Sequence, residues 1–169
     1  DVLPDAIAVV DPHRSDCPSS FKEMSGVGVA FKLVCALEGD DGDILIEEYG
    51  DLVALGTIGD VVTLTGENRV MVRRGLRLMN ENPRPGISAL MEIAGMGDKP
   101  FSASTAAFTL CPRINAAGRM GSAYKAFDLL LCEDEEEATN LAEEISRMNT
   151  LMTTMKLNMS IIASTMSMC

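Results

Sequence analysis

Apolar residues recur at helical spacing along most of the chain, and short polar segments with glycine or proline interrupt them. One segment, 51–58, is apolar almost throughout and suits either a core helix or a strand, and we favour a helix. Ser25 and Ser102 are candidate N-caps, because a serine hydroxyl accepts a hydrogen bond from the free N–H groups of a first helical turn. The segments expected to be helical are 29–37, 51–58, 67–80, 87–94, 102–110, 123–131 and the chain from Asp134 onward.

About one strand is expected, over residues 6–10. Its five apolar residues end at Asp11-Pro12, and a continuous apolar run with a proline stop is typical of a buried parallel strand. The polar segments 11–20 and 112–121 are expected to be loops. Because a single strand cannot form a doubly wound sheet, the sequence predicts a mostly helical part of an α/β unit.

The segment from Asp134 onward is expected to form one long helix, with acidic residues in its first turn that complement the helix dipole. Apolar residues then recur at spacings of three and four, which indicates core packing or a partner interface rather than a cofactor site. This stripe consists of Leu141, Ile145, Met148, Met152, Met155 and Met159.

The length of 169 residues suits one domain or a large piece of a bigger one, and 47% hydrophobic with 23% charged residues indicates a globular chain. No apolar run reaches the ~18 residues of a membrane-spanning helix, so we expect no membrane partner. Five cysteines, far apart and odd in number, favour buried thiols in a reducing compartment over disulfides or a zinc site, and we expect a cytoplasmic location. His13, the only histidine, is expected at the surface, so a multi-histidine metal site is excluded.

The formal net charge of −11 disfavours a nucleic-acid partner at first sight, but the acidic residues are unevenly distributed. Residues 38–51 hold seven acidic side chains and residues 133–144 hold seven more, which leaves 11 acidic side chains against all 14 basic ones elsewhere. Ligand binding follows local fields rather than net charge, so a polyanionic partner is compatible with the sequence.

Two segments near helix ends are candidates for chemistry. Ser25-Gly26-Val27-Gly28 has backbone N–H groups for a phosphate, but without a full GxGxxG or a Walker lysine its glycines are better explained by close helix packing. Asp60 follows Gly59 between two apolar stretches. It fits a metal ligand as well as a helix cap or turn, because an unpaired buried carboxylate is costly and a single aspartate does not define a site.

The segment 112–119 combines two arginines, an amide side chain and several small residues. The guanidinium groups of Arg113 and Arg119 suit a phosphate, Asn115 adds hydrogen-bonding groups, and the small residues allow a ligand backbone to approach. A loop held by arginine–carbonyl hydrogen bonds is the alternative, and the anion site is favoured. The arginine-rich stretch 69–77 is instead expected to be a solvated helix face.

Three segments of the chain resemble the RecJ family of single-stranded-DNA exonucleases, in the family's order and approximate spacing. The first includes Cys17-Pro18 and FKEMSGVGVAFKL at 21–33, the second is DLVALGTIGDVV at 51–62 with Leu64 and GENR at 66–69, and the third is PRINAAGR at 112–119. The similarity extends over roughly residues 5–150.

The resemblance implies a DHH-superfamily phosphoesterase, whose α/β parent domain contains a DHH-type parallel sheet. Such enzymes hold two divalent ions, Mn²⁺ or Mg²⁺, on aspartates and histidines. RecJ-type members degrade single-stranded DNA from its 5′ end to mononucleotides in repair and recombination. By this resemblance Asp60 matches the last metal-binding, catalytic aspartate, and Arg113, Asn115 and Arg119 match a loop against the substrate. A single-strand-binding protein or a helicase is the implied protein partner.

The chain lacks several parts of the family pattern. The earlier metal motifs, including the Asp-His-His triplet, are expected upstream of Asp1, and a DHHA1-type domain is expected beyond the long helix. We therefore interpret residues 1–132 as the C-terminal half of a DHH-type catalytic domain and residues 133–169 as a connector helix. Beyond about Asn149 the methionine-rich sequence departs from the family's Arg-, Gln- and Glu-rich helix.

Two other functions stay open at this point. One is a catalytically inactive DHH-related module that binds nucleic acid or serves as a scaffold, and the other is a DHH phosphoesterase acting on short oligonucleotides or cyclic dinucleotides. Retention of Asp60 favours an enzyme, and the segments at 21–33 and 112–119 resemble RecJ more than the other phosphoesterases. With one matched metal ligand, the chain by itself is expected to be catalytically inactive.

Overall fold

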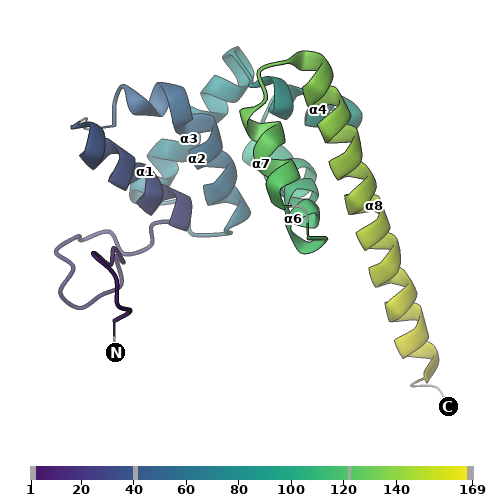
Figure 1. Cartoon of the computed structure of the whole chain (residues 1–169), viewed down its shortest axis with the longest axis horizontal. Helices are drawn as coiled ribbons and strands as arrows, with labels where there is room; N and C mark the ends of the chain where they lie inside the picture. Colours follow the sequence, from purple (N-terminus) through teal and green to yellow (C-terminus); the bar gives the residue numbers. More distant parts are fainter. Residues whose placement is uncertain (1–2, 40–41, 122, 167–169) are drawn as a thin grey trace. The chain divides into compact units, whose positions relative to one another are not determined.

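The computed structural model describes residues 3–39, 42–121 and 123–166, which are helical and contain no strand (Figure 1). The chain divides into two compact units, Asp1–Glu81 and Asn82–Cys169, which are described separately. No helix in the described ranges combines the length and the apolarity needed to cross a membrane. None of the described cysteines forms a disulfide: Cys35 and Cys111 are buried and Cys17 and Cys132 are half-buried, while Cys169 lies outside the described residues.

The first unit contains α1 (Gly26–Glu38), α2 (Leu45–Gly59) and α3 (Gly66–Glu81). Ser25 is the N-cap of α1, as predicted, and its Oγ accepts a hydrogen bond from the N–H of Gly28 at 3.1 Å. Helix α1 ends at Gly39, whose φ of 69° is a left-handed conformation that glycine adopts without a steric penalty. The helix favoured for 51–58 is confirmed.

Helices α2 and α3 pack closely because glycines line their contact. A Cβ atom on Gly75 would lie 2.0 Å from the carbonyl oxygen of Gly50, so only glycine allows this backbone approach. Side chains from all three helices also form a buried apolar cluster. Its members are Phe31, Cys35, Ile46, Val53 and Met71.

The helix predicted over 67–80 is confirmed as α3, and it is amphipathic. Its buried side consists of Asn68, Met71, Val72, Gly75 and Met79. Val70 is apolar but 55% exposed, because it falls between the positions that repeat every three to four residues.

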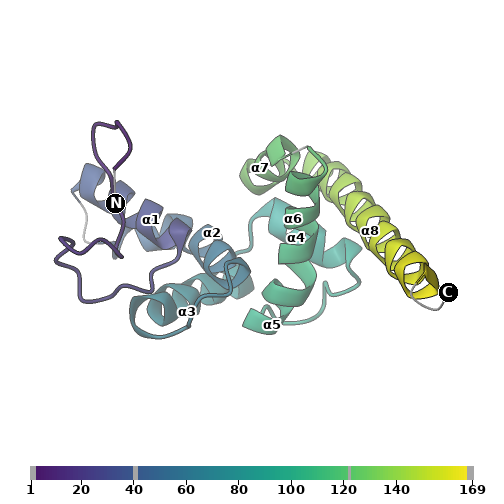
Figure 2. The same cartoon turned by 90° about the horizontal axis from the view of Figure 1, so that it is seen from below.

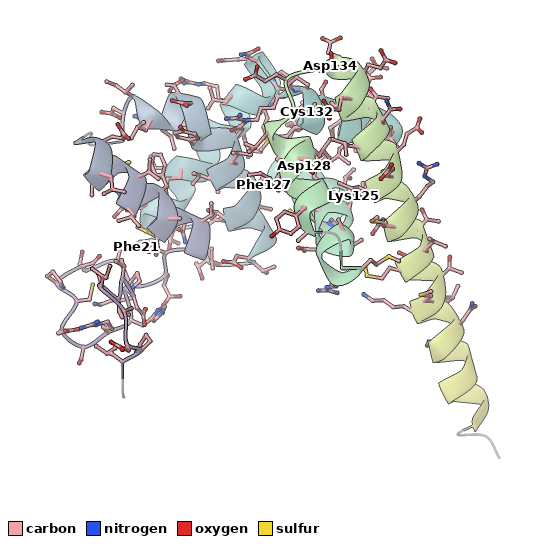
Figure 3. All side chains as sticks on the ribbon, in the orientation of Figure 1. Phe21, Lys125, Phe127, Asp128, Cys132 and Asp134 are labelled. Carbon is pink, nitrogen blue, oxygen red and sulfur yellow. The ribbon has the colours of Figure 1, made fainter. Side chains whose placement is uncertain are left out.

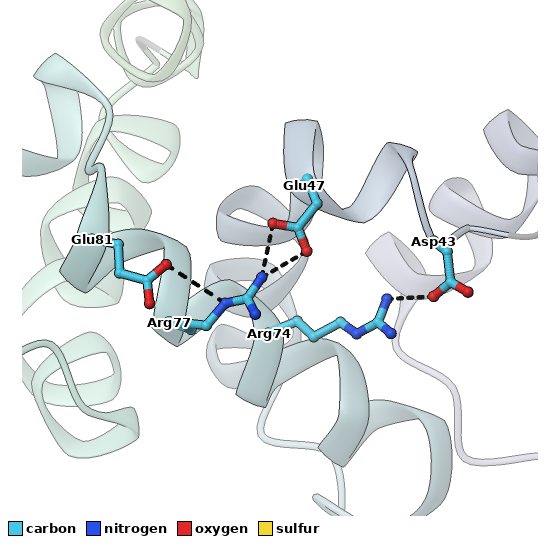
Figure 4. A network of polar contacts seen from close by, with 5 residues as sticks. All are labelled: Asp43, Glu47, Arg74, Arg77 and Glu81. Carbon is cyan, nitrogen blue, oxygen red and sulfur yellow. Dashed lines mark hydrogen bonds and ion pairs between the residues drawn. The ribbon is translucent and has the colours of Figure 1, made fainter.

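Two of the arginines on the outer side of α3 pair with acidic residues of the 38–51 segment (Figure 4). Arg74 contacts Asp43 at 2.6 Å, and Arg77 contacts Glu47 at 2.7 Å and Glu81 at 3.7 Å. These exposed pairs agree with the expected solvated face and balance part of the local acidic charge.

The strand predicted over 6–10 is not confirmed. Residues 5–7 form a bend, and the side chains of Ala6, Ile7, Ala8 and Val10 are exposed. A strand requires a neighbouring strand to bond its N–H and C=O groups, and no other segment in the described ranges is extended in this way. The apolar run therefore corresponds to an exposed apolar segment and not to a strand.

The second unit contains α4 (Pro85–Ile93), α5 (Ala103–Thr105), the π-helix η1 (Ala106–Leu110), α6 (Cys111–Arg119), α7 (Ala123–Leu131) and α8 (Glu135–Met166). Ser102 caps α5 as predicted, because its Oγ accepts a hydrogen bond from the N–H of Thr105 at 3.1 Å. Helix α4 packs tightly on α7: a Cβ on Gly86 would lie 2.0 Å from the carbonyl oxygen of Leu129.

The loop predicted over 112–121 is wrong for most of its length, because residues 111–119 form α6. Pro112 lies in the first turn of α6, and the preceding turn is a π-helix in which the N–H of Cys111 donates to the carbonyl of Ala106. A proline has no N–H for the carbonyl four residues back and its ring crowds that carbonyl, and a wider π turn accommodates both. The chain turns only after Met120, where Gly121 has a φ of 79°.

Helix α8 begins as predicted, directly after Asp134 (Figure 3), and the N–H of Glu137 donates to Asp134 Oδ1 at 2.8 Å. Its first half packs on α4, α6 and α7 through the fully buried Ala138, Ala142 and Ile145, while its second half extends beyond these helices (Figures 1 and 2). The methionine stripe is therefore only partly a packing surface: Met155 is 60% exposed, and the side chain of Met159 lies outside the described residues. The boundary between residues 1–132, interpreted as half of a catalytic domain, and the connector helix 133–169 stays a prediction.

Candidate functional site

Asp60 is the residue that ends α2, and its side chain is exposed. Its Oδ2 accepts a hydrogen bond from the N–H of Gly26 at 3.3 Å, at the first residue of α1. Free N–H groups at a helix N-terminus attract a carboxylate. In the described part of the chain, the other carboxylate oxygen accepts no hydrogen bond. Asp60 thus makes a structural contact at a helix end, as the cap-or-turn alternative expected, and its second oxygen can still accept a ligand.

The backbone directly after Asp60 is strained. Val61 has a φ of 58°, and among the described residues other than glycine it alone has a positive φ. A β-branched residue is strongly disfavoured in this left-handed region, and such strain persists only when the surroundings hold it in place. The N–H of Val61 donates to the carbonyl of Ile58 at 3.2 Å, which closes the turn that follows α2.

Three buried polar side chains, Ser25, Thr57 and Asn68, hold the segments on either side of this turn. The hydroxyls of Ser25 and Thr57 lie 2.7 Å apart, which joins the start of α1 to the last turn of α2. Asn68 donates from Nδ2 to the carbonyls of Glu23 at 2.6 Å and Thr63 at 3.1 Å.

The same Asn68 also accepts from the N–H of Ser25 at 3.4 Å. This network was not predicted from the sequence. Asn68 is a polar residue at a packing position of the amphipathic α3, and that signal was available in the sequence.

The glycines of the Ser25–Gly28 segment are explained by packing. A Cβ on Gly28 would lie 2.9 Å from Met24 Cγ and 3.2 Å from Met71 Cε, so a larger residue would displace both methionines. This observation supports the packing interpretation over a phosphate site.

The described residues do not form a complete metal centre. They include no group of three or more His, Cys, Asp or Glu side chains that could hold an ion. His13 is 66% exposed and contacts only Asp11 among charged groups, so it adds no ligand near Asp60. The described chain therefore offers Asp60 as one candidate ligand, which is too few to hold a divalent ion.

Arg113 and Arg119 lie on different sides of α6. Arg113 donates from Nε to Ser146 Oγ at 3.2 Å, on α8, and from a terminal nitrogen to the carbonyl of Thr109 at 2.6 Å. Its partial burial lowers the pKa of the guanidinium group. These contacts hold α6 on α8 and occupy guanidinium N–H groups that were expected to bind an anion.

Asn115, Gly118 and Arg119 are all exposed and share one face of α6, because residues three and four apart on a helix are neighbours. Arg119 has no hydrogen bond or ion pair within the described ranges. A Cβ added to Gly118 would meet nothing within 4 Å, so open space lies above this part of the helix. A free guanidinium, an amide and an uncovered backbone together suit a phosphodiester.

The chain is similar to curated exonucleases over most of its length. It is 43% identical over 147 residues to the single-stranded-DNA-specific exonuclease RecJ of Bacillus subtilis, covering 87% of this chain and 18% of that protein. It is 41% identical over 161 residues to the RecJ of Escherichia coli, covering 88% and 28% of the two chains. The chain thus spans less than a third of the length of these relatives. No protein-family model matches it.

Solved structures show the same relationship in three dimensions. The crystal structure of RecJ in complex with Mg²⁺ from Thermus thermophilus matches with a TM-score of 0.72 at 38% identity, over 84% of this chain and 23% of that one. The crystal structure of exonuclease RecJ bound to manganese matches with a TM-score of 0.72 at 38% identity, over 84% and 36% of the chains. Over the segment that it spans, this chain is a homologue of the RecJ single-stranded-DNA-specific exonucleases.

Proposed function

We propose that this chain is part of a metal-dependent exonuclease that hydrolyses phosphodiester bonds of single-stranded DNA from the 5′ end, releasing mononucleotides in DNA repair and recombination. The observation that carries this proposal is identity of 37–43% to RecJ exonucleases over 81–88% of the chain. Because the substrate is DNA, we place the enzyme in the cytoplasm. A single-strand-binding protein or a helicase as a further partner stays a prediction.

Asp60 is the proposed contribution of the first unit to catalysis. Relatives of this chain bind Mg²⁺ or Mn²⁺ in crystals, and we propose the same cofactors here. Such an ion, when bound, activates water and stabilises charge on the scissile phosphate. Asp60 is held in place by three features: the hydrogen bond from Gly26, the turn at Val61, and the network of Ser25, Thr57 and Asn68. We propose that the other ligands come from the Asp-His-His part of a longer parent.

The exposed face of α6 is the proposed contribution of the second unit to substrate binding. Arg119, which has no partner among the described residues, supplies a cation, and Asn115 supplies hydrogen-bonding groups for the DNA backbone. Arg113 also matches the family motif, but its contacts with Ser146 and Thr109 support a second role in holding α6 on α8. We therefore expect Arg119 to contribute more to DNA binding than Arg113.

A nuclease assay on the whole-length parent tests this function. With Mn²⁺, we expect digestion of a 5′-phosphorylated single strand to mononucleotides, no digestion after chelation of the metal, and little digestion of a blunt duplex. Strands labelled at the 5′ or the 3′ end report the polarity. The 169-residue chain in parallel is expected to be inactive, because its described residues offer one candidate metal ligand. Binding of single strands without metal-dependent digestion by the parent would favour the inactive binding module.

A further inference from the structure

Phe108, Asn115 and Arg119 are three exposed positions along one continuous helical stretch, because η1, which contains Phe108, continues directly into α6. Asn115 and Arg119, four residues apart, lie about one α-helical turn from each other. Phe108 lies seven residues before Asn115, and because this interval begins in a π-helix, which has more residues per turn than an α-helix, it spans less than two turns. The three side chains therefore form a row along the helix that a few nucleotides can follow.

Phe108 is 80% exposed, while Ala106 and Leu110 on either side of it are completely buried. A single exposed apolar residue is ordinary by itself. Here the exposed residue is aromatic, and the row that it begins continues to an amide and an unpaired guanidinium. The carbonyl of Phe108 also lies four residues before Pro112, which cannot donate to it, and π turns of this kind often occur at functional sites.

We propose that Phe108 is a base-stacking residue of a single-stranded DNA site on the η1–α6 face, with the strand's phosphates held by Arg119 and Asn115. The inference rests on the proposed function and adds the part of the substrate that the polar residues do not contact. Aromatic side chains bind single strands by stacking on bases, while cations bind the phosphates, and such stacking tolerates any sequence. The space above Gly118 lets the backbone pass close to the helix.

A tryptophan reporter tests the stacking directly. The chain contains no tryptophan, so Phe108→Trp introduces its only indole. Added at low salt, an oligothymidylate is expected to quench this fluorescence, and an abasic strand of equal length and charge is not. Leu37→Trp, at a position on α1 that is 76% exposed, is the matched control and is expected to respond to neither strand.

Affinity measurements separate stacking from the phosphate contacts. Phe108→Ala and Phe108→Leu are expected to raise the Kd for oligothymidylate about five-fold or more, whereas Phe108→Tyr is expected to retain the affinity. The abasic strand is expected to bind the unmodified chain and these three variants with the same affinity. An unchanged melting temperature is expected, because the side chain is exposed. Arg119→Ala is expected to weaken binding of both strands.

The outcomes distinguish this inference from the function on which it rests. If Arg119→Ala weakens binding and the Phe108 variants do not, the stacking role is overturned while the phosphate contacts stand. The same pattern, with unchanged DNA binding by the Phe108 variants, would be observed if Phe108 contacted a protein instead of DNA bases. If the unmodified chain binds neither strand, or Arg119→Ala changes nothing, the DNA interface on α6 is overturned, and the stacking role with it.

Discussion

Arg113 donates from Nε to Ser146 Oγ at 3.2 Å, and this contact joins α6 to α8. Arg119, six residues further along, has no partner in the described part of the chain. The two arginines were grouped by sequence into one anion site, but a helix separates residues six apart onto different sides. Their different surroundings lead to different expected effects when each is removed.

Arg113→Ala is expected to lower the free energy of unfolding by about 1–3 kcal/mol, because two hydrogen bonds from a partly buried cation are lost. Arg119→Ala is expected to change it by less than about 0.5 kcal/mol, as for other exposed residues. Urea unfolding of both variants measures the difference. Equal effects would show that the contacts with Ser146 and Thr109 contribute nothing to stability.

The salt dependence of DNA binding tests the phosphate contact of Arg119. Each cation that contacts a phosphate of a single strand releases counterions and adds about 0.7 to the slope of log affinity against log salt concentration. Arg119→Ala is therefore expected to lower the slope by about this amount, and Arg113→Ala by less. Titrations of labelled oligothymidylate at several salt concentrations give the slopes, and a slope unaltered by Arg119→Ala would remove this residue from the interface.

Two glycines in helices are expected to respond oppositely to alanine. Gly75→Ala forces a Cβ to within 2.0 Å of the carbonyl oxygen of Gly50, so α2 and α3 must separate and the protein should lose more than about 2 kcal/mol of stability. Gly118→Ala meets no neighbour and should stabilise the chain by about 0.5–1 kcal/mol. Thermal unfolding compares the two variants, and destabilisation by Gly118→Ala would show that α6 is not as uncovered as described.

Asn68→Ala is expected to lower stability by about 2 kcal/mol or more, because it leaves the carbonyl of Glu23 and the N–H of Ser25 without their partner. Asn80→Ala is the matched control, since Asn80 is an exposed asparagine on the same helix. Chemical unfolding of both variants checks the prediction. Similar values for the two would mean that Asn68 does not hold the segments around Asp60.

Most helices were predictable because their apolar residues repeat at helical spacing and two of them have serine caps. The helix over 67–80 and the cap at Ser25 depend on residues a few positions apart, which a sequence displays directly. The strand predicted over 6–10 is not found, because strand formation depends on a neighbouring strand and not on the apolar segment alone.

The candidate site was predictable in its residue types but not in its arrangement. Pro112 and Gly118 indicated a loop, whereas a π turn before Pro112 lets the chain continue as a helix. The helix then separates Arg113 from Arg119. Neither the exposure of Phe108 nor the hydrogen bonds of Asn68 could be inferred from local spacing, since both depend on how distant segments pack.

Asp60→Asn in the whole-length parent tests the central claim most directly. The amide oxygen of asparagine can still accept the hydrogen bond from Gly26, so the fold is expected to persist, while the charge that a divalent metal requires is lost. Asp43→Asn, which removes an exposed carboxylate paired with Arg74, is the matched control. We predict that Mn²⁺-dependent digestion of single-stranded DNA is abolished by Asp60→Asn and retained by Asp43→Asn. Near-normal digestion by Asp60→Asn would contradict the assignment of Asp60 to the metal site.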